Sequence, residues 1–100
     1  MRLKDFNETF SEQLRDPEYV RFFLEECLND GLDNFLIGLR DVVKANGGFG
    51  QVASDLSLNR ESLYKSLSSD GNPAFKTVQA VLDEVGIRLA FQPKDPLIAA

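Results

Sequence analysis

The chain has 100 residues, 43% of them apolar, which predicts one globular domain and excludes both a disordered chain and a two-domain protein. It carries 11 basic and 16 acidic side chains, a net charge of −5, although DNA-binding domains are usually basic. No apolar run approaches the roughly 20 residues that cross a bilayer, and no charged-then-apolar leader opens the chain, so we expect a cytoplasmic protein.

Apolar spacing and helix-end signals predict three helices in the first half of the chain. The first is short, and the second begins with Asp16 as N-cap and Pro17 at its first position. The third covers about residues 32–45 and is ended by glycines. The apolar stripes that we expect to face the core are Leu3, Phe6, Phe10 and Leu14; Val20, Phe23, Leu24, Cys27 and Leu28; and Leu32, Leu36, Leu39 and Val43.

Three more helices are predicted in the second half. The fourth covers about residues 49–56, and the fifth about residues 60–68 with Asn59 as its N-cap. The sixth begins after a turn in which Asn72 is able to cap it, and Gly86 ends it. Its predicted apolar stripe is Phe75, Val78, Val81, Leu82 and Val85.

The apolar period changes from helical to alternating after Gly86. Ile87, Leu89 and Phe91 alternate with other residues, which predicts a short strand. A lone strand leaves its backbone groups unpaired, so we expect these three residues to pair across the two-fold axis of a dimer. Residues 93–100 contain two prolines and are predicted to be a tail, which leaves residues 1–92 as a single domain.

Residues 49–67 are typical of a helix-turn-helix, with the small Ala53 where the two helices cross and a tight polar turn between them. On the second helix, Leu63 and Leu67 face the preceding helix. Reading a DNA major groove requires a helix with one anchored side and one polar side. The polar arc of this helix consists of Arg60, Glu61, Tyr64, Lys65 and Ser68.

The residue types on this arc suit contacts with DNA. Arg60 can bind guanine through two hydrogen bonds, and Lys65 can reach a base or a phosphate. Tyr64 can pack on a thymine methyl group or donate to a phosphate, and Gln51 at the start of the fourth helix can bind the backbone. Ser57 stands where such turns commonly have glycine, which implies a backbone cost.

The alternative interpretation is an ordinary surface helix. In that case Glu61 and Lys65 form an ion pair one turn apart, and Tyr64 only covers part of the core. The two interpretations differ in whether the side chains of the polar arc interact with other residues of this chain or stay available to DNA.

Four segments resemble the addiction-module antidote proteins, which are HigA-type antitoxins with a lambda-repressor-like DNA-binding domain. The resemblance covers nearly the whole chain and is carried by residues 59–73 and 85–89, with 16–20 and 39–48 upstream. The expected fold is therefore all-α, a lambda-repressor-like helix-turn-helix bundle of about six helices, with the short C-terminal strand added. The DNA-contacting positions that the resemblance implies are Gln51, Asn59, Arg60, Glu61, Tyr64 and Lys65.

The resemblance also implies a homodimeric repressor of its own operon that neutralises a toxin, typically an mRNA-cleaving ribonuclease of the RelE/HigB kind. Residues 1–46 carry six Lys/Arg against ten Asp/Glu, a net of −4, whereas residues 47–100 carry five against six. An RNA-binding toxin is expected to be basic. We therefore assign toxin binding to the acidic side chains of this half, with a solvated face as an equal alternative: Glu25, Glu26, Asp30 and Asp33. Removing residues 1–30 is expected to abolish toxin binding and spare the fold.

The sequence contains no signal of catalysis. It has no His and a single Cys27, so the commonest general base and a zinc site are absent, and no disulfide forms within the chain. The glycines of residues 47–50 lack the Gly-Lys-Ser/Thr ending of a phosphate loop. We expect no enzyme, no cofactor and no metal. The remaining alternative to an antitoxin is a phage-type regulator or a protein-interaction module without a toxin partner.

Overall fold

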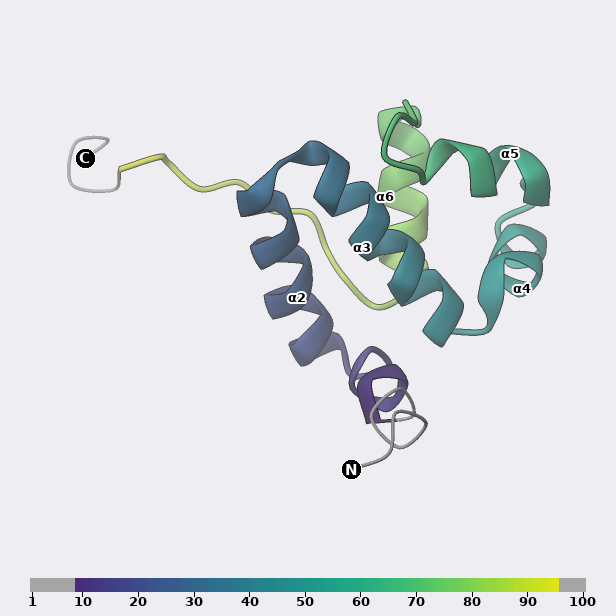
Figure 1. Cartoon of the computed structure of the whole chain (residues 1–100), viewed down its shortest axis with the longest axis horizontal. Coiled ribbons are helices and arrows are strands. Elements are labelled where there is room, and N and C mark those ends of the chain that lie inside the picture. The colour runs from purple at the N-terminus through teal and green to yellow at the C-terminus, as the bar shows by residue number, and fades with distance from the viewer. Residues whose placement is uncertain (1–8, 96–100) are drawn as a thin grey trace.

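The computed structural model describes residues 9–95, and this part of the chain is all-helical (Figure 1). A first helical segment (residues 9–13) precedes five helices. The predicted stripe residues Leu3 and Phe6 lie outside the described residues. The five helices are α2 (Pro17–Asp30), α3 (Leu32–Ala45), α4 (Gly48–Asp55), α5 (Arg60–Ser66) and α6 (Phe75–Glu84).

One apolar core joins these elements. Between residues 9 and 95, the predicted stripes face it except at Leu28, Leu32 and Phe75, which are 52%, 65% and 63% exposed. Each of these three lies in the first or last turn of its helix. The buried core residues are Leu14, Val20, Leu24, Leu36, Leu39, Val42, Val43, Phe49, Val52, Ala53, Leu63, Leu67, Val81, Leu82 and Val85.

Two of the predicted helix caps are confirmed and one is wrong. The Asp16 side chain accepts a hydrogen bond from the second residue of α2, and Asn59 accepts one from the third residue of α5. Asn72 does not cap α6, because that helix begins three residues later with Ala74 as its N-cap and no side-chain cap. Helix α5 ends at Ser66, two residues before the predicted end.

The predicted C-terminal strand is wrong, since residues 87–91 are irregular and no strand occurs between residues 9 and 95. Gly86, with φ of 87°, ends α6, and the Ile87 amide donates to the Leu82 carbonyl at 2.8 Å. Ile87 and Leu89 pack against the core from outside, while Phe91 is 88% exposed. The alternation thus marks an extended segment lying on the bundle. The domain boundary at residue 92 stays a prediction.

The first helical segment and the two residues after it, Leu14 and Arg15, dock on the rest of the bundle. The Asn46 amide nitrogen donates to the carbonyls of Leu14 and Val42, both at 2.8 Å. The Arg15 Nε donates to the last carbonyl of α3 at 3.1 Å. The rings of Phe10 and Phe23 meet edge to face, with centroids 5.5 Å apart. These contacts fix residues 10–15 on α2 and α3.

The Asn46 side chain supports a prediction for stability. Asn46→Ala is expected to lower the free energy of unfolding by about 1–3 kcal/mol, because it leaves the partly buried Leu14 carbonyl without its donor. Urea denaturation measures the loss. The matched control is Asn34→Ala, which removes one exposed bond to the Asp30 carbonyl and should cost less than about 0.5 kcal/mol. Equal losses in the two variants would contradict the assigned role.

Helices α2 and α3 approach closely at Gly38. A Cβ atom there would lie 2.6 Å from the Cys27 sulfur, so only glycine permits this spacing. Burial raises the pKa of the Cys27 thiol, with smaller contributions from nearby carboxylates. Cys27 is therefore a packing residue between the two helices, as the sequence predicted.

Candidate nucleic-acid interface

Helices α4 and α5 are joined by a four-residue turn whose backbone is fixed by the end of α4. The amides of Ser57 and Leu58 donate back to the carbonyls of Ser54 and Ala53, at 3.2 and 2.8 Å. Ser57 is left-handed, with φ of 57°, in the position where this motif favours glycine. The left-handed conformation that the sequence implied for Ser57 is therefore observed.

Helix α5 has an anchored side and an exposed side. Leu63 and Leu67 are 2% and 0% exposed and hold the helix against the core. The opposite side is open, as the spacing predicted, and we call it the α5 face. It consists of the exposed residues Arg60, Glu61, Tyr64 and Lys65.

The charged residues of the α5 face are available to a partner. Arg60 extends over the backbone of Gly50 in α4, where a Cβ atom would lie 3.8 Å from the arginine Nε. Within the part of the chain that the structure describes, Glu61 and Lys65 form no ion pair. The charge pairing of an ordinary surface helix is thus not observed on α5.

The other predicted DNA-contacting residues are engaged within the chain. The Asn59 side chain is the N-cap of α5. The Ser68 hydroxyl lies 2.8 Å from the Lys65 carbonyl and is half-buried. Gln51 is exposed, but its amide donates to Asp55 at 2.8 Å. Asn59 and Gln51 are both exposed, and the bond from the Gln51 amide is one that a competing acceptor can replace.

Tyr64 forms a stack that joins three helices. It is 43% exposed, and its ring lies edge to face with Phe49 of α4 at 5.1 Å. The Arg40 guanidinium, from α3, lies over the same ring at 4.2 Å from its centroid. The sequence analysis missed Arg40, because the helix-turn-helix pattern carries no information about which α3 residue meets α5.

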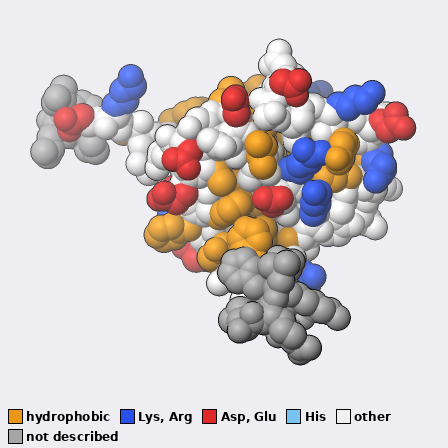
Figure 2. Space-filling view, viewed as in Figure 1, with side chains coloured by type: hydrophobic (Ala, Val, Ile, Leu, Met, Phe, Trp, Pro, Cys, Tyr) orange, Lys and Arg blue, Asp and Glu red, His pale blue; other side chains and the backbone are white. Residues whose placement is uncertain are grey.

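Charge is divided between the two ends of the bundle. Residues 9–39 carry two Arg against seven Asp/Glu, whereas residues 40–65 carry four Lys/Arg against three Asp/Glu. Figure 2 shows acidic side chains mostly over the half formed by α2 and the start of α3, and basic side chains mostly over α4 and α5. The α5 face therefore lies in the less acidic part of a chain with a net charge of −5.

A groove between α2 and α3 lies at the acidic end of the bundle, and we call it the α2–α3 groove. Its apolar lining includes Phe23 and Ile37, and its acidic lining is Glu26, Asp30 and Asp41. Burial raises the pKa of Asp41 more than the neighbouring Lys44 and Arg40 lower it. The groove thus presents carboxylates, one of them partly desolvated, beside apolar surface.

Two of the four predicted toxin-binding residues line this groove, and the other two lie outside it. Glu26 and Asp30 line it. Glu25 lies outside and its carboxylate is 3.7 Å from Arg21, which also binds Glu18 at 3.0 Å. Asp33 lies in the first turn of α3, outside the lining.

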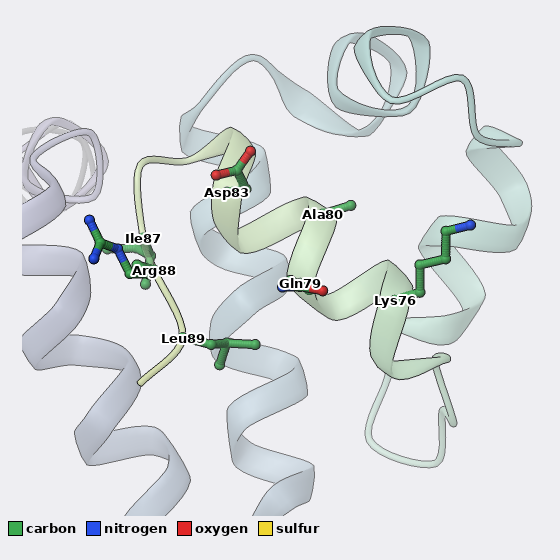
Figure 3. Close-up of a pocket in the computed structure, with 7 residues that line it drawn as sticks. All are labelled: Lys76, Gln79, Ala80, Asp83, Ile87, Arg88 and Leu89. Atoms are coloured by element: carbon green, nitrogen blue, oxygen red, sulfur yellow. The ribbon is translucent and has the colours of Figure 1, made fainter. Parts of the chain in front are cut away.

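A second hollow lies between α6 and the segment that follows it (Figure 3). Lys76, Gln79, Ala80 and Asp83 form one side, and the predicted dimerisation residues Ile87 and Leu89 lie on the other with Arg88. Between residues 9 and 95, no helix is long and apolar enough to cross a membrane, and no group of His, Cys, Asp or Glu side chains is arranged to hold a metal ion.

The comparisons with known proteins identify the family. Residues 2–93 match the family described as probable addiction module antidote protein. An uncharacterized protein of Haemophilus influenzae (strain Rd) is 36% identical over 92 residues, which cover 91% of this chain and 92% of that protein. No solved structure matches the chain. Antidote proteins are non-enzymatic regulators that act on a cognate toxin. The chain therefore belongs to the addiction module antidote family, acts as an antitoxin, and is not an enzyme.

Proposed function

We propose that this antidote protein binds operator DNA through α4 and α5, as a helix-turn-helix of the lambda-repressor-like type, and represses its own operon. The single observation that supports it most is the α5 face: Leu63 and Leu67 are buried behind it, while Arg60 and Lys65 are exposed in front without ion-pair partners among residues 9–95. This is the division that a helix in the major groove requires.

The proposed contacts follow from the chemistry of each side chain. Arg60 binds a guanine through two hydrogen bonds, Glu61 accepts from a cytosine amino group, and Lys65 reaches a base or a phosphate. Gln51, in the first turn of α4, binds a backbone phosphate. Asn59 and Ser68 act by shaping α5 and the turn after it, because Asn59 caps the helix and the Ser68 hydroxyl bonds to the Lys65 carbonyl.

We also propose that the protein binds DNA as a homodimer, because one α5 reads only a few base pairs. The exposed Phe91, next to the half-buried Ile87 and Leu89, is the surface that we assign to the dimer contact, now without strand pairing. DNase footprinting of the DNA upstream of the gene for this chain tests both proposals. The expected result is two protected half-sites roughly 34–36 Å apart. Protection of a single asymmetric site would contradict the dimer, and no protection would contradict DNA binding.

For the toxin we propose a basic, mRNA-cleaving ribonuclease of the RelE/HigB kind, bound at the α2–α3 groove. The support is charge: three carboxylates and no Lys or Arg line the groove, and Asp41 among them is partly desolvated. A cationic side chain of the partner placed among them would gain Coulomb energy, most of it from Asp41, because Glu26 and Asp30 are exposed to water and Asp41 is half-buried. Phe23 and Ile37 supply apolar surface beside it.

The groove gives a prediction for toxin binding. The double variant Glu26→Gln/Asp30→Asn is expected to weaken binding of the neighbouring gene's product by about 2 kcal/mol, roughly 1 kcal/mol per carboxylate. Isothermal titration calorimetry with the co-expressed toxin measures it. The matched control is Glu25→Gln/Asp33→Asn, which removes the same charge outside the groove and should change the affinity little. Equal weakening by the two double variants would instead favour a general effect of net charge.

A further inference from the structure

Arg40 is a cation without an acceptor in the part of the chain that the structure describes. Its Nε is buried and has no hydrogen-bond partner, and the guanidinium forms no ion pair with any residue from 9 to 95. Arginine stays charged at every physiological pH and carries five N–H donors. A charged donor group held in this way gains more than an exposed one from an anion that reaches it.

The stack on Tyr64 places this cation at the α5 face. Phe49 is 5% exposed and fixes the Tyr64 ring from the core side, and the ring in turn supports the Arg40 guanidinium at 4.2 Å. Arg40 comes from α3, so a cation from another helix lies beside the α5 face. A guanidinium already held on a ring loses little conformational freedom when a ligand binds.

We infer that Arg40 binds a phosphate of the DNA backbone beside the bases that α5 reads. This inference rests on the proposed DNA-binding function. A phosphate offers the paired oxygen acceptors that match the arginine fork, and phosphates flank any base pair that a groove-bound helix contacts.

The test compares salt dependence and sequence dependence in wild type, Arg40→Gln and Arg21→Gln. The control removes the same charge from α2, where Arg21 is paired with Glu18 at 3.0 Å. Binding is measured by fluorescence anisotropy between 50 and 200 mM salt. Two probes are used: a duplex from upstream of the gene for this chain and a duplex of equal length with scrambled sequence.

Loss of one phosphate contact predicts a slope of log affinity against log salt that is smaller by about 0.9, so that affinity falls about threefold less across this range in Arg40→Gln. The variant should weaken both duplexes by the same factor. Arg21→Gln should keep the wild-type slope. Arg40→Lys keeps the charge, so we expect it to keep the slope while binding both duplexes more weakly.

Two outcomes overturn the inference. A wild-type slope in Arg40→Gln shows that Arg40 only supports Tyr64, whatever the loss of affinity. A loss restricted to the upstream duplex shows that it reads a base. If wild type binds neither duplex, the proposed function fails and the inference fails with it; if wild type binds and only the slope prediction fails, DNA binding by α5 stands.

Discussion

Removal of residues 1–30 is expected to unfold the protein. The deletion removes Leu14, Val20 and Leu24, which are 2%, 1% and 5% exposed, together with the whole of α2. Truncating one such leucine to alanine typically costs about 2–5 kcal/mol, and the total stability of a domain is only about 5–15 kcal/mol. Circular dichroism with a urea titration measures the result: low helix content and no cooperative transition.

This prediction replaces the expectation from sequence that the deletion would spare the fold. That expectation treated the N-terminal helices as an acidic attachment, whereas the Asn46 amide and the Phe10–Phe23 contact tie the first helical segment to α2 and α3. Loss of toxin binding in the truncated chain would therefore say nothing about the α2–α3 groove. A cooperative transition at the wild-type urea midpoint would show that the core does not need α2.

Arg60→Ala is expected to weaken operator binding by about 1–3 kcal/mol and to relax specificity at one base pair. Arg60 is exposed, so the free energy of unfolding should change by less than about 0.5 kcal/mol. Toxin affinity should stay unchanged, because the arginine lies over Gly50 of α4 and not at the α2–α3 groove. Fluorescence anisotropy on the operator and on its single-base variants measures both effects.

Lys76→Ala is the matched control, since Lys76 is also exposed and basic but lies on α6. It should leave both affinity and base preference unchanged. Normal operator binding by Arg60→Ala would show that the α5 face does not read bases. The same assay distinguishes Arg60 from Arg40. Loss of a base contact lowers the affinity for the operator sequence only, whereas loss of a phosphate contact lowers the affinity for every duplex.

Local features of the fold, other than the start of α6, could be predicted from the sequence. Asp16 and Asn59 cap their helices because a short side-chain oxygen reaches the free amides of a first turn, which depends on neighbouring residues only. Leu63 and Leu67 are buried because their spacing places them on one side of α5.

Features that depend on contacts between distant segments could not be predicted. The alternation after Gly86 fits a strand as well as an extended segment on a helical surface, and only the packing of Ile87 and Leu89 against the core decides between them. The charge pattern along the sequence did not show which of the four predicted toxin-binding residues, Glu25, Glu26, Asp30 and Asp33, share a site. The approach of α3 to α2 at Gly38 creates the groove that selects two of them and adds Asp41.

The most direct test of the account is amide hydrogen exchange of the full chain with and without the duplex from upstream of its gene. If α5 enters the major groove, exchange should slow from residue 60 to residue 65 and at Gln51, and stay unchanged along the α2–α3 groove. Slower exchange confined to α2 and α3, or no change at a duplex concentration that saturates binding, would contradict DNA recognition by α5.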